Sequence, residues 1–344
     1  MRDFLGKVVM IHEDLPLIDL HRHLDGNVRL GTILEIGQMH GLDLPSNTME
    51  GLRPYVQVTE PQADIMAYFQ KFELMVSVFV DYEACRRVAY ENVLDAKGEG
   101  IDYIELRFSP WFMAEPHNLD PEGVVEVVIE GVHKGIADAE DIRVNLLGII
   151  SRTYGVEIAN HELDALLAYK DNIVGLDLAG DEKNFPAELF VDHFKKARDA
   201  GWGITAHAGE SVGSSSVWHA IQDLGASRIG HAVHIMDDQR LIDYMLEQRI
   251  GIEANLTSNV HTNTVSSYDA HPLKKQLDLG LLATINTDDP GISPVTLRYE
   301  FEVAAPKAGL TEEDTRKAQL NALEVAFMTE DEKRYLLKLR GNKS

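Results

Sequence analysis

Two histidines separated by one residue, His21 and His23, follow a short apolar run near the start of the chain. In an extended strand, successive side chains point to opposite faces, so residues two apart share a face. Both imidazoles would then point the same way from the end of a buried strand. Two converging imidazoles make half of a transition-metal site, and zinc is the commonest metal there. An isolated His-x-His is more often a pair of ordinary loop residues, so the rest of the chain must decide.

The composition limits what the chain can do. Cys85 is the only cysteine, so any metal must be held by His, Asp or Glu rather than by a cysteine cage. A formal charge of −24 argues against a nucleic-acid surface and against anionic membranes. No apolar run approaches the roughly 18 residues that span a bilayer. Charges interrupt residues 1–16, which fits no signal or transit peptide, and a cytoplasmic location is expected.

Short β-branched runs alternate with amphipathic stretches along the chain. Strands are expected at residues 17–21, 101–108, 142–150, 173–178, 203–207, 227–231, 251–255 and 282–286. Helices are expected at residues 84–97, 123–137, 162–169, 187–200, 215–224, 238–247 and 272–279. This alternation predicts an α/β fold, a (β/α)8 TIM barrel formed by residues 1–344 as a single domain. The alternative is a doubly wound sheet, but its glycine-rich turn after the first strand is missing.

Two segments exceed a minimal barrel and predict extra helices after the first strand and at the C-terminus. They are residues 30–80 and residues 296–340. Within the first, residues 65–75 carry apolar side chains at helical spacing, which usually means packing. Because this stretch lies in a loop that follows a strand, an apolar lid over the active site is the functional alternative.

Barrel enzymes place their chemistry at the C-terminal ends of the strands. Polar clusters follow five of the expected strands here, at residues 21–26, 178–182, 205–210, 228–231 and 284–290. His21, His23, His207 and an aspartate after the eighth strand would make a zinc site of three histidines and one carboxylate. Asp288 and Asp289 are adjacent, so in extended backbone they face different ways. One can bind metal while the other faces the substrate.

These clusters resemble the motifs of adenosine deaminases in the zinc amidohydrolase superfamily, and the chain is most similar to the bacterial purine-nucleoside type. The resemblance covers roughly residues 15–339, with all motifs in the family's order. The motifs are His-Arg-His-Leu-Asp-Gly at 21–26, Leu-Ala-Gly-Asp-Glu at 178–182, Thr-Ala-His-Ala-Gly-Glu at 205–210, Arg-Ile-Gly-His at 228–231 and Asn-Thr-Asp-Asp-Pro-Gly at 286–291. It implies one metal-dependent hydrolase domain with one Zn²⁺ per chain.

The resemblance also implies a role for each matching residue. The metal ligands would be His21, His23, His207 and Asp288. The catalytic residues would be Glu210, as proton donor to the purine, and His231, which would hold the water at the metal. The substrate-binding residues would be His23, Asp25, Gly180 and Asp289. Among these, Asp289 would meet ring nitrogen N7, the Gly180 backbone N–H would meet N3, and Asp25 would take the sugar 5′-hydroxyl.

The implied reaction is hydrolytic deamination of adenosine and 2′-deoxyadenosine to inosine and 2′-deoxyinosine, with release of ammonia, as in purine salvage. Zinc makes hydroxide available by lowering the pKa of water to about 7. His231 and Asp288 would take the proton of that water and aim it at C6. Addition to C6 pushes electrons onto N1, where a protonated Glu210 would stabilise the intermediate.

Asp25 decides between substrates in this interpretation. A buried carboxylate accepts a hydrogen bond from a 5′-hydroxyl but repels a 5′-phosphate, which argues against AMP. Relatives that act on the free base tend to carry Glu at this position, whereas this chain has Asp. A nucleoside substrate is therefore expected. The alternatives are adenine and an adenosine metabolite with a modified 5′ end.

Other function classes predict different features. The second zinc deaminase design needs at least two cysteine ligands, and a single cysteine excludes it together with the usual nucleic-acid editing enzymes. A rival of another class is a binding protein that keeps zinc only for structure; a loss of Glu210 or His231 would have favoured it, but both residues are present. The expected partner is a small purine nucleoside, and the chain should be a monomer or homodimer. The other histidines are expected to be structural or solvent-exposed: His12, His40, His117, His133, His161, His193, His219, His234, His261 and His271.

Overall fold

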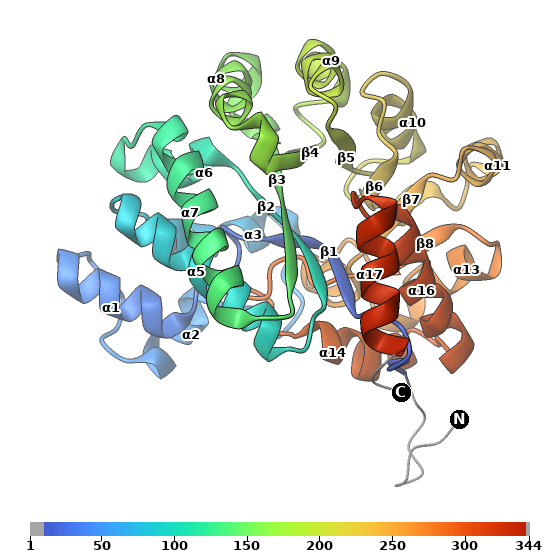
Figure 1. Cartoon of the computed structure of the whole chain (residues 1–344), viewed down its shortest axis with the longest axis horizontal. Coiled ribbons are helices and arrows are strands. Elements are labelled where there is room, and N and C mark those ends of the chain that lie inside the picture. Colours follow the sequence, from blue (N-terminus) through green and yellow to red (C-terminus); the bar gives the residue numbers. More distant parts are fainter. Residues whose placement is uncertain (1–9, 342–344) are drawn as a thin grey trace, which may run out of the picture.

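The computed structural model describes residues 10–341, which form a barrel of eight parallel strands with helices packed around it (Figure 1). The strands are hydrogen-bonded to one another in chain order, from β1 to β8. They are β1 Ile18–His23, β2 Tyr103–Phe108, β3 Arg143–Ser151, β4 Ile173–Ala179, β5 Gly203–Ala208, β6 Arg228–His231, β7 Gly251–Ala254 and β8 Leu282–Ile285. This order confirms the (β/α)8 prediction, and the doubly wound alternative is wrong.

The α-helices alternate with the strands along the chain. They are α1 Leu30–His40, α2 Met49–Val56, α3 Ile65–Phe69, α4 Phe72–Val76, α5 Tyr82–Gly98, α6 Pro110–Ala114, α7 Pro121–Ala139, α8 Gly155–Ala168, α9 Val191–Asp199, α10 Ser214–Gln222, α11 Gln239–Gln248, α12 Leu256–His261, α13 Leu273–Asp278, α14 Leu297–Tyr299, α15 Ala305–Lys307, α16 Glu312–Val325 and α17 Glu330–Gly341. None of the helices in this part of the chain is long and apolar enough to cross a membrane.

The barrel closes where the chain after β8 meets β1. The backbone N–H of Asp288 donates to the carbonyl of His21 at 2.8 Å, and the N–H of His23 donates to the carbonyl of Asp288 at 2.9 Å. Arg22 and Asp288 form the corresponding parallel bridge. This seam therefore holds His21, His23 and Asp288 at fixed positions relative to one another.

The apolar stretch at residues 65–75 forms two short helices, α3 and α4, rather than one continuous helix. Tyr68 and Met75 are fully buried in the core. Tyr68 also lines the cavity at the C-terminal ends of the strands, together with Phe69 and Phe72. The stretch therefore contributes apolar side chains both to the core and to the lining of the cavity.

The C-terminal segment covers the opposite end of the barrel. Leu336 of α17 packs with Ile18 and Leu20 at the start of β1. The Phe327 ring, between α16 and α17, lies 3.7 Å from the guanidinium carbon of Arg228 at the start of β6. The expected extra helices at the C-terminus thus close the N-terminal ends of the strands, which leaves the other end free for the site.

Gly203 provides a test of this end closure. A Cβ atom added at Gly203 would lie 2.5 Å from the Phe327 ring, so G203A should force the ring outward and lower stability by about 1–3 kcal/mol. Gly98, at the end of α5, has no atom within 4 Å of an added Cβ, and G98A is the matched control. Urea unfolding of both variants measures the difference. Equal midpoints for the two would contradict the packing described.

Candidate active site

A cavity of about 480 Å³ lies at the C-terminal ends of the strands. Of the nine site residues expected from the sequence, eight line it: His23, Asp25, Gly180, His207, Glu210, His231, Asp288 and Asp289. The ninth, His21, is fully buried beneath the cavity floor. The structure therefore brings the predicted residues together from strands far apart in the sequence.

Three imidazoles and one carboxylate converge at the floor of this cavity. His207 Nε2 lies 3.1 Å from His21 Nε2 and 3.2 Å from His23 Nε2. Asp288 Oδ1 lies 3.2 Å from His21 Nε2 and 3.4 Å from His23 Nε2. Four ligands placed tetrahedrally at zinc bond lengths are separated by about 3.3 Å. These four distances match the spacing of metal ligands.

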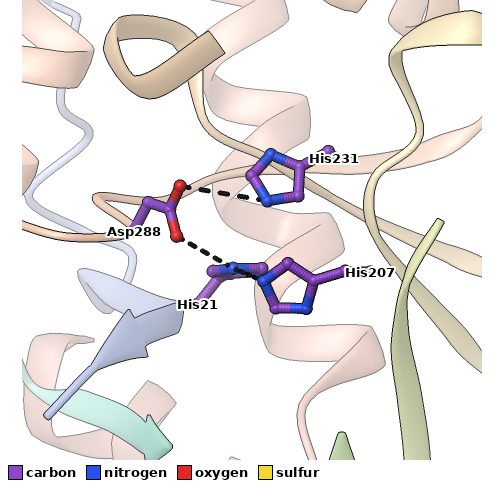
Figure 2. Close-up of side chains that lie close together, drawn as sticks. All are labelled: His21, His207, His231 and Asp288. Atoms are coloured by element: carbon purple, nitrogen blue, oxygen red, sulfur yellow. Dashed lines mark hydrogen bonds and ion pairs between the residues drawn. The ribbon is translucent and has the colours of Figure 1, made fainter. Parts of the chain in front are cut away.

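His231 faces the same point from the opposite side (Figure 2). Its Nε2 lies 3.9 Å from Asp288 Oδ2, so it meets the carboxylate oxygen that is turned away from His21 and His23. His21, His207, His231 and Asp288 also form a buried group with the spacing of a metal site. Two overlapping sets of four ligands are thus possible, differing only in His23 or His231.

Carboxylates behind two of the imidazoles set their tautomers. His21 Nδ1 lies 2.7 Å from Glu253 Oε2, and His207 Nδ1 lies 3.1 Å from Asp177 Oδ1. A carboxylate accepts a hydrogen bond from Nδ1–H, so the ring proton stays on Nδ1 and the lone pair is on Nε2. The two bare Nε2 atoms then face each other at 3.1 Å with no hydrogen between them. A cation at this point would satisfy both, so the residues fit a bound metal.

Arginines in the barrel interior keep these two carboxylates ionised. Arg107 lies 2.9 Å from both Asp177 and Glu253, and Arg228 lies 2.7 Å from Glu253. Burial alone would raise the pKa of Asp177, but His207 and Arg107 hold that pKa well below its usual range. Burial opposes the charge of Glu253 in the same way, and Arg107 and Arg228 hold its pKa well below the usual range.

Asp288 adopts a left-handed backbone conformation with φ of 66°. The extended backbone assumed in the sequence analysis is therefore wrong at this position, although the two aspartates do face different neighbours. A positive φ outside glycine costs about 1–3 kcal/mol and persists only where the surroundings enforce it. The backbone hydrogen bonds to His21 and His23 enforce it here.

Asp289 points into the cavity without a partner for one oxygen. Its Oδ1 has no hydrogen-bond partner among the described residues and lies where a Cβ atom on Gly26 would be, 1.8 Å away. Only glycine at position 26 leaves room for this carboxyl. Burial, together with the nearby charges of Asp288 and Asp25, raises the pKa of Asp289 well above its usual range. A protonated Asp289 can donate a hydrogen bond to a ligand.

Glu210 lies on the loop after β5, three residues beyond His207. Burial, followed by the charges of Asp288 and Glu182, raises the pKa of Glu210 well above its usual range. The buried Glu182 also holds the loop in place, because its carboxylate accepts backbone N–H groups from Gly209 at 2.6 Å and Ser211 at 2.8 Å. The raised pKa of Glu210 favours the protonated form of this acid, which faces the cavity.

Asp25 and Gly180 both line the cavity. Asp25 Oδ2 accepts the backbone N–H of Ser109 at 2.9 Å, and burial raises the pKa of Asp25 to about 7. Gly180 has φ of 107°, a conformation that strains any L side chain, and an added Cβ would lie 2.5 Å from Thr153 Oγ1. Glycine therefore lets the backbone itself border the cavity at this point.

The residues that hydrogen-bond or pair with the site residues from outside the cavity were assigned no role from the sequence. These are Arg107, Asp177, Glu182, Glu253, Asn255 and Asn259. Three of them, Arg107, Asp177 and Glu253, are charged residues in the middle of apolar strands. Charged side chains are almost never fully buried unless they are paired, so this pattern was the available signal.

Converging histidines at the mouth of a (β/α)8 barrel define the class of metal-assisted barrel enzymes. The sequence profile described as "Adenosine deaminase" matches residues 16–340, and the chain belongs to the adenosine deaminase family. The family named in the sequence analysis is thereby confirmed.

Individual relatives and solved structures agree with this membership. An adenosine deaminase of Pseudoalteromonas translucida is 52% identical over 97% of this chain and 100% of its own length. One from Vibrio cholerae is 54% identical over 95% of this chain and 98% of its own. The crystal structure of an adenine deaminase from Arthrobacter aurescens, 22% identical, superposes with a TM-score of 0.85 over 96% of this chain and 99% of its own, which shows a shared fold. An Arabidopsis N6-mAMP deaminase is 26% identical, with a TM-score of 0.83 over 96% and 98% of the two chains.

The metal site can be tested by removing its carboxylate. D288A should lower metal affinity by at least about 100-fold, because one ligand of the set is lost. D289N changes the neighbouring acid, which faces the cavity, and should retain the metal. Metal content after dialysis against a mild chelator, measured by atomic absorption, separates the two. Full occupancy in D288A, or equal loss in both variants, would mean that a different carboxylate holds the metal.

Proposed function

We propose that this protein is a zinc-dependent adenosine deaminase that converts adenosine and 2′-deoxyadenosine to inosine and 2′-deoxyinosine, with release of ammonia, in purine salvage. The observation that carries the proposal is the position of Glu210, a buried acid with a raised pKa, in the same cavity as the histidine and aspartate cluster. The names of the relatives from Pseudoalteromonas translucida and Vibrio cholerae support the same substrate.

We assign one Zn²⁺ per chain to His21, His23, His207 and Asp288. Both His21 and His23 Nε2 lie 3.1–3.4 Å from His207 Nε2 and from Asp288 Oδ1, whereas the contact of His231 with Asp288 is longer at 3.9 Å, which supports this set. When bound, Zn²⁺ supplies Lewis-acid chemistry, which lowers the pKa of water from about 16 to about 7.

Glu210 and His231 lie next to each other and act on different atoms of the reacting centre. Glu210 donates its proton to N1 of the purine, where electrons accumulate when oxygen adds to C6. His231 Nδ1 lies 3.6 Å from Glu210 Oε1, and its Nε2 faces Asp288, so the ring borders the space between acid and metal ligands. This position suits a residue that orients the attacking water.

Three groups on the cavity wall bind the nucleoside. Asp289, protonated because its pKa is raised, donates to N7, which is a hydrogen-bond acceptor. The backbone N–H of Gly180 meets N3. Asp25 accepts the 5′-hydroxyl, and its buried position opposes a 5′-phosphate. His23 borders the substrate through the edge of its ring. The apolar side chains of Phe69 and Phe72 exclude water from above.

Replacing the acid tests its role directly. E210Q keeps the size and the hydrogen-bonding shape but has no transferable proton, so kcat should fall by at least about 100-fold while zinc is retained. Since the raised pKa keeps Glu210 protonated, the wild-type rate should decline as pH rises through that pKa, and E210Q should lack this decline. Ammonia release across a pH series measures both effects. Near-normal kcat in E210Q would remove Glu210 as the acid.

Lengthening Asp25 tests recognition of the sugar. D25E pushes the carboxylate into the space of the ribose, so the ratio of kcat/KM for adenine to that for adenosine should rise by at least about tenfold. D25N keeps the length of the side chain and serves as the matched control. Ammonia release from adenine, adenosine, deoxyadenosine and AMP gives the ratio for each protein. An unchanged ratio in D25E would place sugar recognition elsewhere.

A further inference from the structure

A chain of hydrogen bonds leads from a backbone amide to the ring of His231, and each of its links has a defined direction. It begins at His271, whose Nδ1 lies 3.1 Å from the backbone N of Leu273. A backbone N–H can only donate, so Nδ1 of His271 is unprotonated. His271 is buried, and burial lowers its pKa to about 3, so the ring is neutral. Its single ring proton is therefore on Nε2.

The next link is Asn259, on α12. His271 Nε2 lies 3.1 Å from Asn259 Oδ1, and because this nitrogen carries the proton, Asn259 accepts. The amide of Asn259 is thereby oriented, with its NH₂ group on the other side. That NH₂ group lies 2.9 Å from His231 Nδ1. The orientation of the amide follows from the backbone N–H of Leu273 and needs no separate assumption.

The last link is His231 itself. Its Nδ1 receives one N–H from Asn259 and a second from Asn255 Nδ2 at 3.2 Å. The oriented NH₂ group of Asn259 can meet only a lone pair, so Nδ1 of His231 is unprotonated and the neutral ring carries its proton on Nε2. Nε2 is the atom that faces Asp288 and the cavity.

We infer that His271 and Asn259 are positioning residues that fix His231 as the Nε2–H tautomer. His231 therefore presents an N–H to the cavity and holds the attacking water as a hydrogen-bond donor. The proton that leaves this water must go to another group, since Nε2 of the neutral ring is already occupied. This inference rests on the proposed deamination for its catalytic meaning, and it revises two expectations: that His231 takes the proton of the water, and that His271 has no part beyond structure.

The tautomer can be read without turnover. In the full chain loaded with Zn²⁺ and labelled with ¹⁵N in its histidine rings, NMR distinguishes protonated from unprotonated ring nitrogens. H231Q identifies the signals. We expect Nε2 of His231 to carry the proton and Nδ1 to be bare. A proton on Nδ1 would overturn the inference, whatever reaction the enzyme catalyses, so its failure is distinguishable from failure of the deaminase proposal.

Variants along the chain test its effect on the rate. N259D is nearly isosteric and still accepts from His271, but it turns the atom facing His231 from donor to acceptor. The proton of His231 should move to Nδ1, and kcat for adenosine should fall by about 100-fold or more with KM little changed. Wild-type kcat in N259D with the proton moved would show that the tautomer has no catalytic effect.

His271 offers a conservative pair. H271Q can place an N–H near the position of Nε2 and keep Asn259 oriented, whereas H271L cannot, so kcat of H271Q should clearly exceed that of H271L. H12L removes a different buried histidine, which contacts the Glu312 carbonyl, and controls for the loss of a core imidazole. It should keep both the ring signals and kcat of the wild type. Equal kcat in H271Q and H271L would contradict the relay.

Discussion

The site depends on a buried ion network inside the barrel. Arg107 pairs with Asp177 and Glu253, and these carboxylates in turn hold the Nδ1 atoms of His207 and His21. Removing one partner of a buried ion pair costs about 3–5 kcal/mol, because it leaves an uncompensated charge. The charged partners therefore hold one another in place. In that arrangement, two Nε2 lone pairs point at a single spot on the cavity floor.

The same kind of constraint acts on each of the two proposed catalytic groups, Glu210 and His231. Glu182 fixes the loop that carries Glu210, and Asn255 and Asn259 fix the ring of His231. None of these holding residues lines the cavity. For Glu182 and Asn259, the direction of these hydrogen bonds is fixed, because a carboxylate only accepts and Asn259 Oδ1 accepts from His271. The protonation states of Glu210 and His231 thus depend on residues that do not line the cavity.

The sequence predicted the framework of the barrel well, because parallel strands buried on both faces read as short β-branched runs. All eight strands lie within two residues of their expected ends. The chemical residues were also predictable, since each stands at the end of a strand. The helices at residues 65–75 were not, because a break between α3 and α4 depends on how the stretch packs over the cavity rather than on its apolar spacing. The conformation of Asp288 was likewise invisible, since no local signal marks a left-handed aspartate.

For the residues that pair with the site residues, the sequence predicts only that they are buried and charged, not which partners they have. Asp177, Arg107 and Glu253 stand out as charges in apolar strands, but nothing in the sequence pairs them with one another or with a particular histidine. His271 lies far from any motif, and its link to His231 exists only because α12 and the segment before α13 pack together. Such pairings arise from the three-dimensional packing of segments that carry no mutual signal along the chain.

The seam that closes the barrel has a thermodynamic consequence. Asp288 bridges β1 by its backbone and faces the histidine cluster by its side chain. Closure of the barrel and binding of the metal therefore both depend on Asp288. Because of this shared residue, each of the two processes favours the other. A ligand that binds only the folded state stabilises it in proportion to the logarithm of its free concentration. The stability of the folded barrel therefore depends on the free metal concentration as well as on the sequence.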